Sequence, residues 1–149
     1  MSADPQTGVM AGIMADLKRA KYISLTTFRL TGAPVVTPVW FALDADGTIY
    51  VESAANAGKV KRIRHTPRVT VATCTINGKL TGPTIESTAH VLTDEQERAY
   101  AVASIARKYG LPRRLYYSLL DYARVVRRKP KDRGDYLAIT IGEFQAIQV

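Results

Sequence analysis

The chain has 149 residues, of which 46% are hydrophobic and 23% charged, so it is long enough for one domain with a buried core. The chain has one cysteine, which excludes an intrachain disulfide. One cysteine and two histidines are too few ligands for a usual structural zinc site. Lysine and arginine number 21 against 13 acidic residues, a net charge of +8 that favours an anionic partner or a solubilising surface. Without a membrane-spanning run or a signal peptide, we expect a cytoplasmic protein with no membrane span.

The N-terminal half alternates between helical and β periodicity. Residues 1–8 are expected to form a disordered tail, followed by a single domain over 9–149. Apolar residues at helical spacing predict a helix over 9–20. Runs of β-branched and aromatic residues, separated by glycine turns, then predict three strands, over 22–28, 35–43 and 48–53.

A basic segment over 56–66 interrupts the β pattern and predicts a short helix, which ends at Pro67. Thr93 is the expected N-cap of a later helix, with Gln96 at the capping-box position. The remaining elements are expected in this order: strands over 68–76 and 80–92, helices over 94–109 and 112–126, and a strand over 136–149.

Six strands joined by tight turns predict a mainly β protein, a six-stranded antiparallel barrel with a few flanking helices. Closure by the C-terminal strand would remove the exposed edges of an open sheet. A doubly wound α/β sheet is disfavoured, because hairpin-length turns join the first three strands.

The chain carries no recognisable catalytic motif of its own. It has no nucleophile elbow, no phosphate-binding Walker loop and no dinucleotide-binding glycine motif. Cys74, in a predicted strand, is interpreted as a buried apolar residue. We therefore assign no catalytic residue and no metal ligand, and expect a bound cofactor to carry the chemistry of any reaction.

The basic helix is a candidate phosphate site. The third strand ends at Ser53, and a turn containing Gly58 leads into a helix whose first turns carry Lys59, Lys61 and Arg62. The free N–H groups of a helix N-terminus attract anions, and lysine or arginine beside them adds charge-assisted hydrogen bonds. A solvated basic surface is the alternative interpretation.

The preceding strand offers a place for a flat ligand. Pro38 lacks the N–H group that a sheet ladder needs, which indicates a strand edge or a bulge. A ring could lie against the backbone there, with Trp40 as a wall. The alternative interpretation is that Trp40 is a core aromatic and Pro38 an ordinary edge-strand residue.

Several of these segments resemble one family in order and spacing. The quoted matches are Tyr22 to Arg29 (YISLTTFR), Thr37 to Phe41 (TPVWF), Gly58 to Arg64 (GKVKRIR) and Pro67 to Val69 (PRV). They resemble the split-barrel flavin and deazaflavin oxidoreductases, which are similar in fold to pyridoxamine-phosphate oxidase. Within that family they look most like the actinobacterial branch that uses the deazaflavin coenzyme F420. The resemblance covers residues 10–92.

The resemblance implies a homodimer of split barrels, with the cofactor in a groove at the subunit interface. It implies that the basic helix holds the cofactor phosphate, that Ser53 reaches the phosphate or ribityl chain, and that the strand before it lies along the ring. The cofactor-binding residues expected on this basis are Thr37, Pro38, Val39, Trp40, Ser53, Gly58, Lys59, Lys61 and Arg62.

The implied activity is hydride transfer from reduced coenzyme F420 to a planar conjugated small molecule, such as a quinone, a biliverdin-like compound or an enone. The coenzyme has a strongly anionic tail, and the basic stretch Arg124 to Arg133 could meet it. Two alternatives stay open. One is an FMN-dependent split-barrel oxidoreductase, because FMN offers a phosphate to the same residues. The other is a basic nucleic-acid-binding module, which the net charge favours but the placement of the aromatic residues does not, so no nucleic-acid partner is expected.

Overall fold

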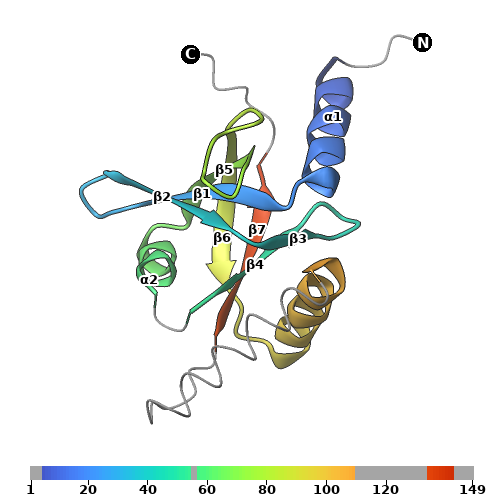
Figure 1. The fold of residues 1–149 in the computed structure, drawn as a ribbon. Helices are drawn as coiled ribbons and strands as arrows, with labels where there is room; N and C mark the ends of the chain where they lie inside the picture. The colour runs from blue at the N-terminus through green and yellow to red at the C-terminus, as the bar shows by residue number, and fades with distance from the viewer. Residues whose placement is uncertain (1–4, 55–56, 110–133, 143–149) are drawn as a thin grey trace.

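A computed structural model describes residues 5–54, 57–109 and 134–142 of the chain (Figure 1). Seven strands form one antiparallel sheet in the order β2-β1-β5-β6-β7-β4-β3. The labelled elements are α1 (Pro5–Arg19), β1 (Tyr22–Phe28), β2 (Pro34–Val39), β3 (Phe41–Leu43), β4 (Ile49–Ser53), α2 (Gly58–His65), β5 (Arg68–Cys74), β6 (Ile85–Val91) and β7 (Asp135–Ile141). Residues 95–109, between β6 and β7, are helical. The mainly β architecture expected from the sequence is confirmed.

The expected second strand, over 35–43, is divided at Trp40 into β2 and β3, which raises the number of strands from six to seven. The two pieces pair with different partners: Val39 of β2 lies opposite Ile23 of β1, and Phe41 of β3 lies opposite Val51 of β4. Because β2 and β3 are the two ends of the strand order, the break joins the edges of the sheet through one residue. The sheet therefore curls into a barrel with a split along β2.

The interior of the barrel is a continuous apolar core. Alternate residues of the strands point inward, among them Ile23 and Leu25 of β1, which are 0% and 1% exposed. Both labelled helices add to this core, α1 through Leu17 and α2 through Val60 and Ile63. Burial of their apolar faces fixes α1 and α2 against the barrel.

The helix over 95–109 packs on the outside of the barrel and forms a second apolar cluster. Its buried residues are Ala101 and Ile105, which lie against Tyr50 of β4 and Ala138 of β7. The expected N-cap, Thr93, is wrong by one residue: Asp94 Oδ2 accepts a hydrogen bond from the Glu97 N–H at 2.9 Å. The aspartate takes the cap because its side chain reaches the free amide three residues later.

Other boundaries differ by a few residues. Helix α1 starts at Pro5 rather than at the expected residue 9. The expected long strand over 80–92 is reduced to β6, with one isolated bridge between Cys74 and Leu80 before it. Residues 1–4, the expected helix over 112–126, the stretch 124–133 and the last residues, 143–149, lie outside the described residues.

The turn between β3 and β4 is the one the sequence predicts. The Asp44 N–H donates to the Thr48 carbonyl at 2.8 Å, and Gly47 has φ of +90°. Glycine adopts that left-handed conformation without the Cβ clash that other residues meet. The hairpin brings β4 back alongside β3 and thereby completes the closed end of the barrel.

One side chain holds the break at Trp40 in place. The Tyr109 hydroxyl, from the helix over 95–109, accepts a hydrogen bond from the Phe41 N–H at 2.8 Å. Its own proton lies within reach of two carbonyl oxygens, Lys21 O at 2.6 Å and Phe41 O at 2.9 Å. Burial raises the pKa of Tyr109 to about 12, so the phenol is neutral and keeps that proton at neutral pH.

We expect Tyr109→Phe to lower the free energy of unfolding by about 1–3 kcal/mol, because it leaves partly buried backbone groups of Phe41 without their partner. Tyr100→Phe is the matched control: Tyr100 is exposed, and its hydroxyl donates to the Asp44 carboxylate rather than to backbone groups. We expect this control to change stability by less than about 0.5 kcal/mol. Urea unfolding followed by circular dichroism measures both, and equal midpoints for the two variants would contradict the prediction.

Candidate functional site

The basic helix predicted from the sequence is α2, and it packs against β1 and β6 at one end of the barrel. Val60 and Ile63 form the buried face of α2. Lys59 and Arg62 are three residues apart, so their side chains are neighbours on the helix surface, and both are half-buried. The first turn contains no acidic residue, and its N-cap residue, Ala57, provides no side-chain hydrogen bond to it. Its free N–H groups and its dipole therefore add to the charge of the two cations.

Arg62 is held by a threonine that sequence analysis did not single out. The Arg62 Nε–H donates to Thr27 Oγ1 at 2.6 Å, and Thr27, on β1, is only 1% exposed. That bond fixes the guanidinium, while its Nη groups donate to no described residue. A signal for Thr27 was present, because it falls on the inward alternation of Ile23 and Leu25, where a polar side chain needs a partner.

Gly58 makes room for this arrangement. A Cβ atom placed on Gly58 would lie 2.8 Å from Arg62 Nη1, inside van der Waals contact. The guanidinium therefore folds back across the first turn of α2 because residue 58 has no side chain. This gives the predicted Gly58 a structural role in placing Arg62.

The surroundings of α2 also affect the pKa of Lys59. Burial, and secondarily the charge of Arg62, lower the pKa of Lys59. No described carboxylate pairs with either cation. Two half-buried, unneutralised cations at a helix N-terminus make a strong local site for an anion.

Ser53 ends β4 close to the start of α2 and lies opposite Asp135 of β7. It is 6% exposed, and its hydroxyl donates to the Ala54 carbonyl at 3.2 Å. A long hydrogen bond to a neighbouring residue leaves the oxygen able to accept from another group. Ser53 therefore lies at the same end of the barrel as α2. Its side chain is on the same inward face of β4 as Val51.

The predicted flat-ligand strand, β2, is at a free edge of the sheet, as Pro38 indicated. Val35 lies opposite Thr27, beside Arg62, and Val39 lies opposite Ile23. Val35 and Val39 are four residues apart, and a strand rises about 3.3 Å per residue. Strand β2 therefore extends about 13 Å from a point beside the α2 cations. Thr37 is half-buried in the middle of this run, Pro38 is exposed and Val39 is buried.

Trp40 lies at the far end of β2 from α2. Its ring stacks on Tyr109, with 5.3 Å between the centroids and 23° between the planes. That contact favours packing as the role of the indole, one of the two interpretations left open by the sequence. Lys61 is also separated from the pair: it is exposed on α2, while Lys59 and Arg62 are half-buried.

Comparison with known proteins identifies the family. Residues 11–141 match the sequence profile of the pyridoxamine 5'-phosphate oxidase family, and the chain belongs to that family. No curated protein sequence matches the chain closely enough to count as a relative. Among the described residues, no helix is long and apolar enough to cross a membrane, and no group of three or more potential metal ligands occurs.

Solved structures share the fold at low sequence identity. A FAD-binding protein from Mesorhizobium loti has a TM-score of 0.60 and 16% identity, covering 89% of this chain and 87% of that chain. The heme storage protein HutZ from Vibrio cholerae has a TM-score of 0.62 and 13% identity, with 90% of each chain covered. A Clostridium acetobutylicum protein of the pyridoxinephosphate oxidase family, related to general stress protein 26, has a TM-score of 0.58 and 17% identity, with 93% and 86% covered. These similarities establish the split-barrel fold.

We expect Thr27→Val to destabilise the fold by about 1–3 kcal/mol, because the Nε–H of the half-buried Arg62 loses a charge-assisted hydrogen bond to a buried side chain. Thr26→Val is the control, since that side chain points to the other face of β1. Chemical denaturation of both variants measures the difference. If the two substitutions destabilise the protein equally, Thr27 does not hold Arg62 in place.

Proposed function

We propose that this protein is an oxidoreductase that binds a phosphate-bearing flavin-type cofactor along β2, with the phosphate on Lys59 and Arg62. The observation that carries the proposal is the pair of half-buried cations at the start of α2, which no described carboxylate neutralises. Ser53 and the free first-turn N–H groups of α2 add neutral polar groups to the same end of the barrel.

The donor set fits such a cofactor. An arginine fixed by its Nε, with both Nη groups directed elsewhere, suits the bidentate recognition of a phosphate. The exposed edge of β2 has backbone groups without a second neighbouring strand, and these can bond the polar rim of a ring system. Thr37, Pro38 and Val39 would lie beside the ring in this arrangement.

We propose coenzyme F420 as the cofactor, on the strength of the motifs in β1, β2 and α2 that resemble the deazaflavin branch. The net charge of +8 suits its anionic tail. FMN is the second candidate, favoured by the family match and by the FAD-binding relative with this fold. When bound and reduced, either cofactor supplies a hydride to an acceptor. A planar conjugated acceptor is the substrate class that could stack on an exposed ring face.

The test is a titration of cofactor-free protein with coenzyme F420, FMN and riboflavin, followed by fluorescence. We expect Lys59→Ala and Arg62→Ala each to weaken binding of the phosphate-bearing ligands by about 1–3 kcal/mol, the scale of one lost charge-assisted hydrogen bond. Riboflavin has no phosphate, so its affinity should not respond. Lys61→Ala is the matched control, because Lys61 is exposed beside the pair.

The same titration separates the cofactors. Tighter binding of coenzyme F420 than of FMN supports the deazaflavin reductase, and the reverse order moves the protein to the flavin branch. If both alanine variants bind all three ligands as the wild type does, α2 is not the phosphate site. If none of the ligands binds, the proposed oxidoreductase is wrong.

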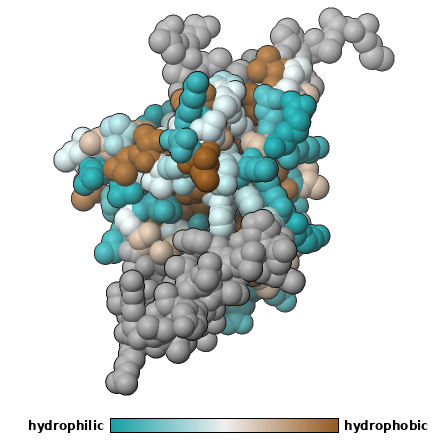
Figure 2. Space-filling view, in the orientation of Figure 1, coloured by the Kyte–Doolittle hydropathy of each residue, from teal (hydrophilic) through white to brown (hydrophobic). Residues whose placement is uncertain are grey.

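We further propose that the protein works as a homodimer through the exposed apolar residues of β2 and of the turn after β5. The helix over 95–109 covers the outside of β4 and β7, at a different part of the barrel. Figure 2 shows apolar residues gathered on the side over β1 and β2. Val36 is 59% exposed there, next to the exposed Pro38, and Ile76 and Leu80 after β5 are 67% and 51% exposed. An apolar patch of this kind favours a protein partner, and we assign it to a second copy.

Val36→Glu should convert the dimer to a monomer, because it would bury a carboxylate in each half of the interface. Val9→Glu, a matched change at an exposed position of α1, should leave the dimer intact. Light scattering coupled to size-exclusion chromatography gives the masses. A monomeric wild type would exclude the dimer, and dissociation by Val9→Glu alone would place the interface elsewhere.

A further inference from the structure

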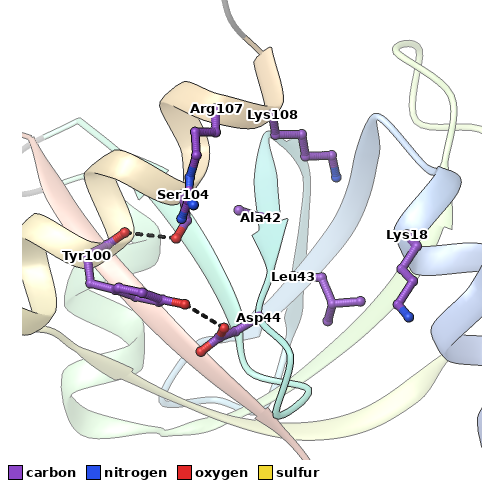
Figure 3. A pocket seen from close by; sticks show the side chains of 8 residues that line it. All are labelled: Lys18, Ala42, Leu43, Asp44, Tyr100, Ser104, Arg107 and Lys108. Carbon is purple, nitrogen blue, oxygen red and sulfur yellow. Dashed lines mark hydrogen bonds between the residues drawn. The ribbon is translucent and has the colours of Figure 1, made fainter.

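A hollow lies away from the proposed cofactor site. It is formed between the C-terminal part of α1, strand β3 and the helix over 95–109, and it has a volume of about 470 Å³ (Figure 3). Cavities of a few hundred cubic ångströms are typical of small-molecule sites. Ala42 and Leu43 of β3 form an apolar floor. In Figure 1, α2 and the helix over 95–109 lie on different sides of the barrel, so this hollow and the α2 cations are separate features.

Three cations line this hollow: Lys18 from α1, and Arg107 and Lys108 from the helix over 95–109. Asp44 is the one carboxylate among the described lining residues, and it accepts hydrogen bonds from the Tyr100 hydroxyl at 2.6 Å and from the Ala45 N–H at 2.7 Å. No described ion pair joins any of the three cations to a carboxylate. The described lining residues therefore carry three positive groups against one negative group, an excess of two positive charges.

Lys108 is the most informative of the three. It is half-buried, and its ammonium lies 3.3 Å from the centroid of the Phe41 ring and 5.5 Å from that of Tyr109. Burial lowers the pKa of Lys108 to about 8, so the group is still mostly charged at pH 7. The aromatic rings compensate part of its lost hydration, and an anion in the hollow would compensate more.

The cations come from both walls of the hollow. Figure 3 shows Lys108 extending from the helix past β3, Lys18 on the α1 side near Leu43, and Arg107 and Ser104 together on the helix side. The Tyr100 ring forms the wall next to Asp44 and is 44% exposed. Apolar and aromatic surface lies beside the cations, as a ligand with both an anionic group and a short apolar body requires.

We propose that this hollow is a second ligand site, which takes a small dianion, a phosphate monoester or a dicarboxylate, with a short apolar or aromatic body. The charge excess matches a dianion, and the floor of Ala42 and Leu43 matches the apolar body. The proposal does not depend on the proposed cofactor or on the dimer, because none of the lining residues belongs to either surface.

The test is a titration of the isotope-labelled full chain with phenyl phosphate, phthalate and phenol, followed by backbone amide shifts. We expect saturable shifts at residues 42–44 and 104–109 with one or both dianions and none there with phenol. Lys108→Met and Arg107→Gln should each weaken that binding about tenfold, the scale of a lost charge-assisted contact. Arg29→Gln, at an exposed turn, is the matched control and should leave it unchanged. Comparing phenyl phosphate with phthalate decides between a phosphate ester and a dicarboxylate.

The α2 cations attract phosphate too, so the titration is repeated on Lys59→Ala. Shifts at 42–44 and 104–109 that persist in this variant belong to the hollow, whatever happens to the cofactor site. Shifts confined to residues 57–62, equal binding of phenol, or unchanged affinity in Arg107→Gln would overturn the proposal. Because Arg107 is exposed, that variant decides the question even if Lys108→Met fails to fold.

Discussion

The break at Trp40 closes the sheet into a barrel, and the placement of the other elements follows from that closure. One stretch of chain serves as β2 beside β1 and then as β3 beside β4, so the two edges of the sheet are joined through a single residue. The Tyr109 hydroxyl satisfies the Phe41 backbone groups at that point and also bonds Lys21, just before β1. Leaving such partly buried groups unpaired is costly, and one phenol from another element removes that cost.

Closure of the barrel also places two groups of cations at different ends of it. At one end, α2 presents Lys59 and Arg62 beside the start of β2, with Thr27 holding the arginine. At the other end, the helix that supplies Tyr109 also brings Arg107 and Lys108 over β3. Among the described residues, two separate basic sites each contain a half-buried lysine whose pKa is lowered by burial.

The basic helix of the α2 site was predictable from local pattern. Which of its cations lie together was not. A glycine followed by closely spaced cations predicted the basic helix, and the alternation of apolar residues predicted the strands around it. Which cations act together depends on which helix face is buried: Val60 and Ile63 pack inward, so Lys59 and Arg62 sit half-buried while Lys61 faces solvent. The partner of Arg62 is 35 residues away on β1, and no local pattern specifies such a pairing.

The mainly β class, the turn at Gly47 and the basic helix could be predicted from local pattern, because each depends on residues close together in the chain. The division of residues 35–43 at Trp40 could not be predicted in this way, because alternation runs through the break and both Val39 and Phe41 are buried. The tertiary structure decided this division, and also the role of Tyr109, which acts across 68 residues, and the hollow under Lys108. Contacts of that range arise from packing of the whole barrel, and local periodicity carries no information about them.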